Sequence, residues 1–185
     1  MKRRILSVLI VACIVVLVYC LHVRVRINDL KSSLADKWTV VETSSVERVK
    51  KLTAVLDFIE KNNLACDSNK MQLLRKELKR AGESNINYDE MTKENLLEFR
   101  NSHRVIANDL NAFIEECNIK NDDLKKMLKS INDLDERMRI QIEDYSNSAK
   151  SFNYYIGRLR HKYVAEFVGA ENQLYFKSMT SDLAE

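Results

Sequence analysis

The sequence predicts an all-α fold, in which an N-terminal transmembrane helix precedes an elongated antiparallel bundle of three to four long helices. The 185 residues include no proline and only three glycines. Because these two residue types supply most tight turns, their scarcity argues against β-sandwiches, barrels and dinucleotide-binding folds. Apolar side chains also recur at steps of three and four along most of the chain, which is the spacing of one helix face.

Residues 1–26 are expected to form a membrane anchor with basic flanks. Lys2-Arg3-Arg4 precede the apolar stretch Ile5–Val23, which as a helix would be about 28 Å long and would cross the hydrocarbon core of a bilayer. A cleaved signal peptide needs small residues at its cleavage site, whereas the end of this stretch, Val18–Val23, is bulky. Lipidation of Cys13, which follows a small residue, is the main alternative. The eight apolar residues after Cys13 favour an uncleaved single-pass anchor.

The charge distribution restricts the partners. Lys and Arg residues are about equally numerous on the two sides of the apolar stretch. Their distribution, which usually sets the orientation of a membrane helix, therefore does not predict on which side of the membrane the rest of the chain lies. Five of the 30 basic residues precede residue 27, which leaves 25 basic against 27 acidic residues in the rest of the chain. This slightly acidic part lacks the basic footprint of a nucleic-acid-binding domain. We therefore expect contact with membrane lipid through residues 5–23 and no nucleic-acid partner.

Residues 27–176 are expected to form the bundle, and residues 177–185 a short polar tail. The first soluble helix should run from Ile27 to Asn62, as a continuation of the membrane segment. The second should end at Gly82, in the left-handed conformation that caps many helices. Thr92 is the predicted N-cap of the third, whose seam is Leu96, Phe99, His103, Ile106, Leu110, Phe113 and Cys117.

The fourth helix is predicted over residues 122–168, about 70 Å if unbroken, with Gly157 as the place of a bend. Such long heptad seams indicate near-parallel packing, as in a coiled coil, so homo-oligomers are allowed but not required. Three aromatic residues off the seam, Tyr154, Tyr175 and Phe176, are candidates to dock the C-terminal segment. The seam has a spacing of seven residues and consists of two rows. The first row is Leu124, Ile131, Met138, Tyr145, Phe152 and Leu159, and the second is Leu128, Asp135, Ile142, Ala149, Ile156 and Tyr163.

No catalytic, cofactor-binding or metal-binding residue is assigned. The three histidines and four cysteines form no metal-binding or redox motif. Cys66 and Cys117 would pair only in an oxidising compartment, and unpaired buried thiols are favoured as the commoner use. His103 is expected to be a core histidine bonded to a neighbouring helix, rather than a pH-sensitive or ligand-binding group. The basic runs 70–80 and 158–162 are interpreted as solvated faces, with lipid contact as the alternative.

The C-terminal part resembles the LemA family. The stretch Tyr145–Ile156 is similar to a family helix in which Tyr-Asn is followed seven residues later by Tyr/Phe-Asn and then Ile. The register continues through Phe176, and Asn28-Asp-Leu30 and Trp38 resemble N-terminal features of the family. Leu159-Arg160 stands where the family has Phe-Pro, and Val168-Gly169-Ala170 where it has Phe-Gly-Phe, as in a divergent member. The resemblance implies a bacterial membrane-anchored helical bundle and supplies no catalytic residues.

The resulting hypothesis is a non-enzymatic scaffold or protein-interaction module at the bacterial cell membrane, whose protein partner the sequence does not identify. The alternative is a ligand-sensing four-helix-bundle domain of a membrane receptor, which predicts a second membrane span that these 185 residues do not contain. An enzyme or metal protein would need a polar cluster inside the bundle, and the seams show none.

Overall fold

The computed structural model describes residues 2–176 and 183–184, and within them the chain is almost entirely helical. The all-helical class and a long, apolar N-terminal helix are thereby confirmed. The elements are α1 (Lys2–Lys61), α2 (Ser68–Glu83), the 3-10 helix η1 (Tyr88–Glu90), α3 (Lys93–Glu116), α4 (Asp122–Gly157), α5 (Leu159–Phe167), β1 (Tyr175–Phe176) and β2 (Leu183–Ala184).

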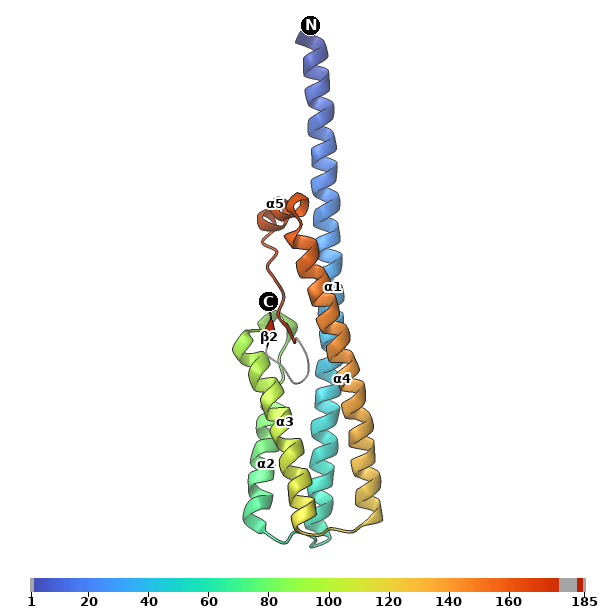
Figure 1. The fold of residues 1–185 in the computed structure, drawn as a ribbon, viewed down its shortest axis with the longest axis vertical. Coiled ribbons are helices and arrows are strands. Elements are labelled where there is room, and N and C mark those ends of the chain that lie inside the picture. Colours follow the sequence, from blue (N-terminus) through green and yellow to red (C-terminus); the bar gives the residue numbers. More distant parts are fainter. Residues whose placement is uncertain (1, 177–182, 185) are drawn as a thin grey trace.

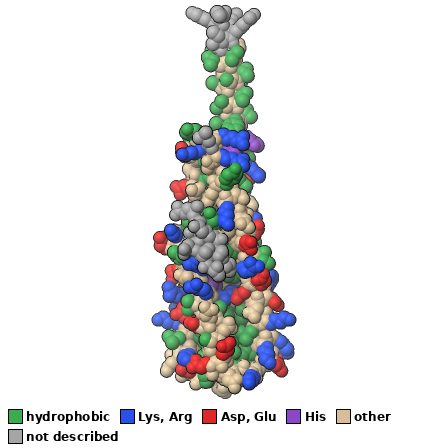
Figure 2. Space-filling model, in the orientation of Figure 1, with side chains coloured by type: hydrophobic (Ala, Val, Ile, Leu, Met, Phe, Trp, Pro, Cys, Tyr) green, Lys and Arg blue, Asp and Glu red, His purple; other side chains and the backbone are tan. Residues whose placement is uncertain are grey.

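Helix α1 is continuous from the apolar N-terminal segment to the far end of the molecule, about 90 Å at the standard rise per residue. Its N-terminal part projects alone beyond the other helices (Figure 1). Below its tip, hydrophobic side chains surround this projection (Figure 2), and the large hydrophobic residues from Leu6 to Val18 are more than half exposed. By length and composition the helix is able to cross a membrane. The predicted continuation of the apolar N-terminal segment into the following helix is confirmed.

The other helices pack on the C-terminal two thirds of α1. Helix α4 runs alongside α1 in the opposite direction, and α2 packs on both α1 and α3 (Figure 1). Near the middle, Trp38 is fully buried against Phe99 and Tyr145, with ring centroids 5.7 and 5.1 Å away. The Trp38 indole N–H donates to the backbone oxygen of Ile86 at 2.7 Å, so the largest core side chain also fixes the loop after α2. We call this packed part, from Val23 onward, the helical body.

Several local predictions agree with the structure. Thr92 is the N-cap of α3, and its hydroxyl accepts from the Asn95 N–H at 3.2 Å. The predicted interruption after residue 117 is present, with Asn118 at a positive φ of 48°. The α3 seam is buried from Leu96 to Phe113. Burial on α4 follows the seven-residue seam from Leu124 to Phe152, so the periodicity located the faces that pack.

Two glycine predictions have different outcomes. Gly82 does not cap α2: the helix continues to Glu83, and the Ser84 N–H closes it on the Arg80 oxygen. A Cβ at Gly82 would meet Val49 Cγ1 at 3.5 Å, so this position faces the contact with α1 instead of a turn. The bend predicted at Gly157 is confirmed, because α4 ends there and α5 is a separate helix. The unbroken 70 Å helix therefore does not form, and Tyr163, predicted on the seam, is 71% exposed.

The segment after α5 folds back along α4. Asn153 brackets Gln173, donating to its backbone oxygen at 2.9 Å and accepting from its N–H at 2.7 Å. Phe176 is buried, which confirms its docking, whereas Tyr154 is 67% exposed and does not dock. In the antiparallel pair of β1 and β2, Tyr175 faces Ala184 and Phe176 faces Leu183. The remaining residues of the predicted polar tail, 177–182 and 185, lie outside the described part.

Candidate functional site

A cavity of about 220 Å³ lies in the helical body, where residues of α3 face residues of α4 across a side chain of α1. Its walls are mostly apolar: Phe99 comes from α3, Met138 and Ile142 from α4, and Phe176 from the folded-back C-terminal segment. The other lining residues are Arg48, Arg100, His103, Arg104, Ala107, Asn108 and Asp135. A concave apolar pocket with a few polar groups is the usual form of a small-molecule site.

A polar network joins three helices beside this cavity. The Arg48 guanidinium from α1, whose side chain is 4% exposed, donates to both carboxylate oxygens of Asp135 on α4, at 2.5 and 3.2 Å. The same guanidinium contacts Nδ1 of His103 on α3 at 3.2 Å. The network therefore links α1, α3 and α4, and it pairs the buried Arg48 charge as a charge in this position requires.

His103 is held neutral. Burial, with a further contribution from the Arg48 charge, lowers its pKa to about 3. A guanidinium only donates, so Nδ1 must accept and the ring proton is on Nε2. Nε2 is buried and has no hydrogen-bond partner among the described residues. An unpaired buried donor costs about 1–3 kcal/mol. The expectation of a core histidine bonded to a neighbouring helix is confirmed, and the same side chain also lines the cavity.

The described lining includes three arginines, Arg48, Arg100 and Arg104, and the carboxylate of Asp135, which is bound to Arg48. Arg104 is exposed at the rim. His103 is not a base at neutral pH, because it protonates only near pH 3. The described lining therefore combines apolar walls with one solvent-exposed basic side chain, Arg104.

No family model, curated protein or solved structure matches this chain. The likeness to LemA therefore stays a prediction that depends on the residues of the C-terminal tract. Across the described residues, no group of three His, Cys, Asp or Glu side chains is arranged to hold a metal ion.

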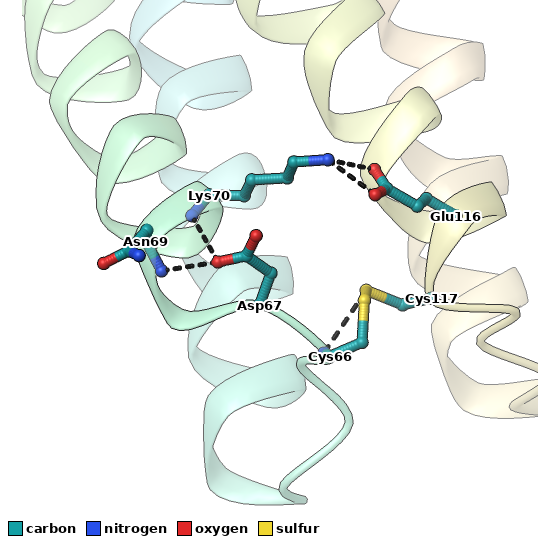
Figure 3. Close-up of a disulfide and its surroundings, with 6 residues drawn as sticks. All are labelled: Cys66, Asp67, Asn69, Lys70, Glu116 and Cys117. Atoms are coloured by element: carbon teal, nitrogen blue, oxygen red, sulfur yellow. Dashed lines mark hydrogen bonds and ion pairs between the residues drawn. A yellow bond between two sulfur atoms is a disulfide. The ribbon is translucent and has the colours of Figure 1, made fainter.

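The four cysteines divide into two pairs with different surroundings. Cys66 and Cys117 form a disulfide that joins the α1–α2 connection to the end of α3 (Figure 3). The preference for unpaired thiols is therefore wrong: both residues lie in connections at the same end of the body, with Cα atoms 5.3 Å apart. Cys13 and Cys20 are free and lie on the apolar part of α1.

The basic run on α2 is neutralised by its neighbours. Lys70 pairs with Glu116 beside the disulfide (Figure 3), and Arg80 pairs with Glu98 at 3.2 Å. Arg75 binds Asp57 at 2.8 Å and also Glu60. These contacts agree with a solvated face, and the run begins at the end of the body opposite to the projecting helix (Figure 1).

Proposed function

We propose that this chain is a membrane-anchored, non-enzymatic protein of the LemA type, whose helices form one elongated antiparallel bundle. It serves as a scaffold or protein-interaction module at the bacterial cell membrane. The observation that carries the proposal is the continuity of α1, which joins an exposed apolar segment of spanning length to the body without a linker. A body held this rigidly presents its helix faces at a fixed distance from the bilayer.

A crosslinking experiment tests the interaction role. The full chain, and a control in which residues 1–26 anchor an unrelated soluble domain, are crosslinked in membranes and their neighbours are identified. Proteins captured reproducibly by the full chain and not by the control would support the scaffold role. Identical sets of neighbours for both would contradict it, because residues 1–26 alone would then account for every captured protein.

We further propose that the helical body faces an oxidising compartment and that the N-terminal basic residues lie on the cytoplasmic side. The support for this orientation is the disulfide between Cys66 and Cys117, since disulfides persist in such compartments and are rare in the cytosol. A membrane-impermeant maleimide applied to intact, reduced cells tests this side: labelling of Cys66 and Cys117 supports it, and labelling only after permeabilisation contradicts it.

A second candidate function is the binding of a small organic anion, as in the ligand-sensing alternative. The cavity favours it, because apolar walls of Phe99, Met138 and Ile142 lie beside the exposed Arg104. Titration calorimetry with hexanoate, hexanol and hexylamine separates charge from apolar size. Binding of hexanoate alone, weakened by Arg104→Glu, supports an anion site. Equal heats for all three, or no effect of Arg104→Glu, would contradict it.

A further inference from the structure

We propose that α5 is an interfacial helix, which lies on the membrane surface and binds anionic phospholipid headgroups. The inference rests on the proposed anchoring by α1. It concerns a surface that the scaffold and ligand-binding roles leave unused: the outer face of α5 together with Arg158, which precedes α5, and the neighbouring basic residues Arg24 and Arg26 of α1.

The position of α5 along α1 is the first argument. The Tyr19 hydroxyl, within the apolar segment, donates to the backbone oxygen of Arg160 in α5 at 3.2 Å. Tyr19 precedes Arg24, the first basic residue after that segment, by five residues or about 7.5 Å of helix. A bilayer crossed by the exposed apolar part of α1 therefore has its boundary at the level of α5. Figure 1 shows α5 crosswise to α1, at the end of the body from which the N-terminal part projects.

The two faces of α5 differ sharply. His161 and Ala165 form the inner face, where they are buried, and the His161 ring lies 4.2 Å from that of Tyr155. Tyr163 and Phe167, also four residues apart, are 71% and 88% exposed. Exposing two large aromatic side chains to water on the outer face of a nine-residue helix is energetically unfavourable. Aromatic residues in this position are typical of the boundary between acyl chains and headgroups.

Charge selects the kind of lipid. Within residues 19–26 and 158–170 there are five basic residues and one acidic residue, Glu166. Glu166 neutralises only Lys162, at 3.8 Å. Arg158 lies over the exposed Tyr154 ring at 4.7 Å, which adds an aromatic side chain to the same surface. Figure 2 shows Lys and Arg side chains gathered where the projecting helix joins the body. Each basic residue near an anionic membrane surface strengthens binding to that surface about fivefold.

Fluorescence quenching by brominated acyl chains tests the proposal in the full chain, reconstituted in phosphatidylcholine bilayers that contain phosphatidylglycerol. Tryptophan is introduced as F167W on α5, V11W in the membrane segment, or I140W on α4 as the matched exposed control. Phe167 and Ile140 are both largely exposed, so neither change disturbs the core, and the buried Trp38 gives the same background in each variant.

We expect strong quenching of F167W and V11W and none of I140W. Quenching of V11W without quenching of F167W overturns the α5 proposal and leaves the anchor intact. Absence of V11W quenching overturns the anchor itself, and the α5 proposal with it.

The headgroup preference is tested by moving the bromine from phosphatidylcholine to phosphatidylglycerol at equal mole fraction. The quenching of F167W should increase, because local enrichment of the anionic lipid by at least about fivefold is expected for the basic residues near it. Arg160→Gln together with Lys162→Gln should reduce the increase. Equal quenching by the two lipids would overturn the preference for anionic headgroups.

Discussion

The network of Arg48, Asp135 and His103 permits a quantitative prediction for Asp135→Asn. The amide keeps the shape of the side chain and one acceptor oxygen, but it removes the charge that faces the Arg48 guanidinium. Loss of one partner of a fully buried ion pair costs about 3–5 kcal/mol. The Arg48 side chain is 4% exposed and that of Asp135 is 37% exposed, so water compensates for part of the loss. We therefore expect the free energy of unfolding to fall by about 2–3 kcal/mol.

The matched control is Asp144→Asn, on the same helix. Asp144 pairs with Lys37 at 2.8 Å, but their side chains are 61% and 31% exposed, and a pair of this kind contributes less than about 1 kcal/mol. Thermal unfolding of the full chain in one detergent, followed by far-UV circular dichroism, measures both variants. The difference of about 2 kcal/mol corresponds to a Tm lower by about 4–8 °C for Asp135→Asn. Equal Tm values for the two variants would refute the importance of the buried charge.

Three further changes test other parts of the structure. His103 takes up a proton near pH 6.5 in the unfolded chain but only near pH 3 in the folded chain, so its contribution to stability is present above pH 6.5 and is lost as the pH falls from 6.5 to 3. In His103→Asn, whose side chain can still accept from the guanidinium, this acid destabilisation of about 2 kcal/mol at about pH 5 should be absent. An unchanged dependence of Tm on pH would contradict this. Replacing Cys66 and Cys117 together by serine opens a loop with a sequence separation of 51 and should cost about 2–4 kcal/mol; a Tm equal to that of the native chain under non-reducing conditions would count against the disulfide. Trp38→Phe leaves the buried Ile86 oxygen unpaired and should cost about 1–3 kcal/mol in urea unfolding, whereas a neutral result would mean that the indole bond does not hold the loop.

Local periodicity predicted the helices because each apolar seam is a property of one segment. The α3 seam and the row from Leu124 to Phe152 are buried as their three- and four-residue steps require. The break after Gly157 was also local, and glycine indicated it. Gly82 misled for the opposite reason: a glycine near the end of a helix signals a cap only if no other helix packs against it, and here Val49 of α1 does.

The candidate site was not predictable from the sequence, because it is formed by contacts between segments that lie far apart in the chain. Asp135 was visible as an ionisable residue within an otherwise apolar row, but its partner Arg48 lies 87 residues away on another helix. Arg48 itself gave no signal, because it stands beside the α1 stripe in a sequence rich in charged residues. The disulfide was missed for a related reason: Cys66 and Cys117 are single cysteines in separate connections, and only the packing of α2 beside α3 brings them together.

Whether α1 anchors an oxidised helical body in the membrane is tested most directly by the intact mass of the protein in membranes washed with alkaline carbonate. We expect a carbonate-resistant chain whose mass includes the apolar N-terminal segment. Its mass should be two hydrogens lower than that of the reduced form, because Cys66 and Cys117 are joined. A chain released by carbonate, or one shortened by loss of the N-terminal segment, would contradict the anchor; a fully reduced mass would contradict the disulfide.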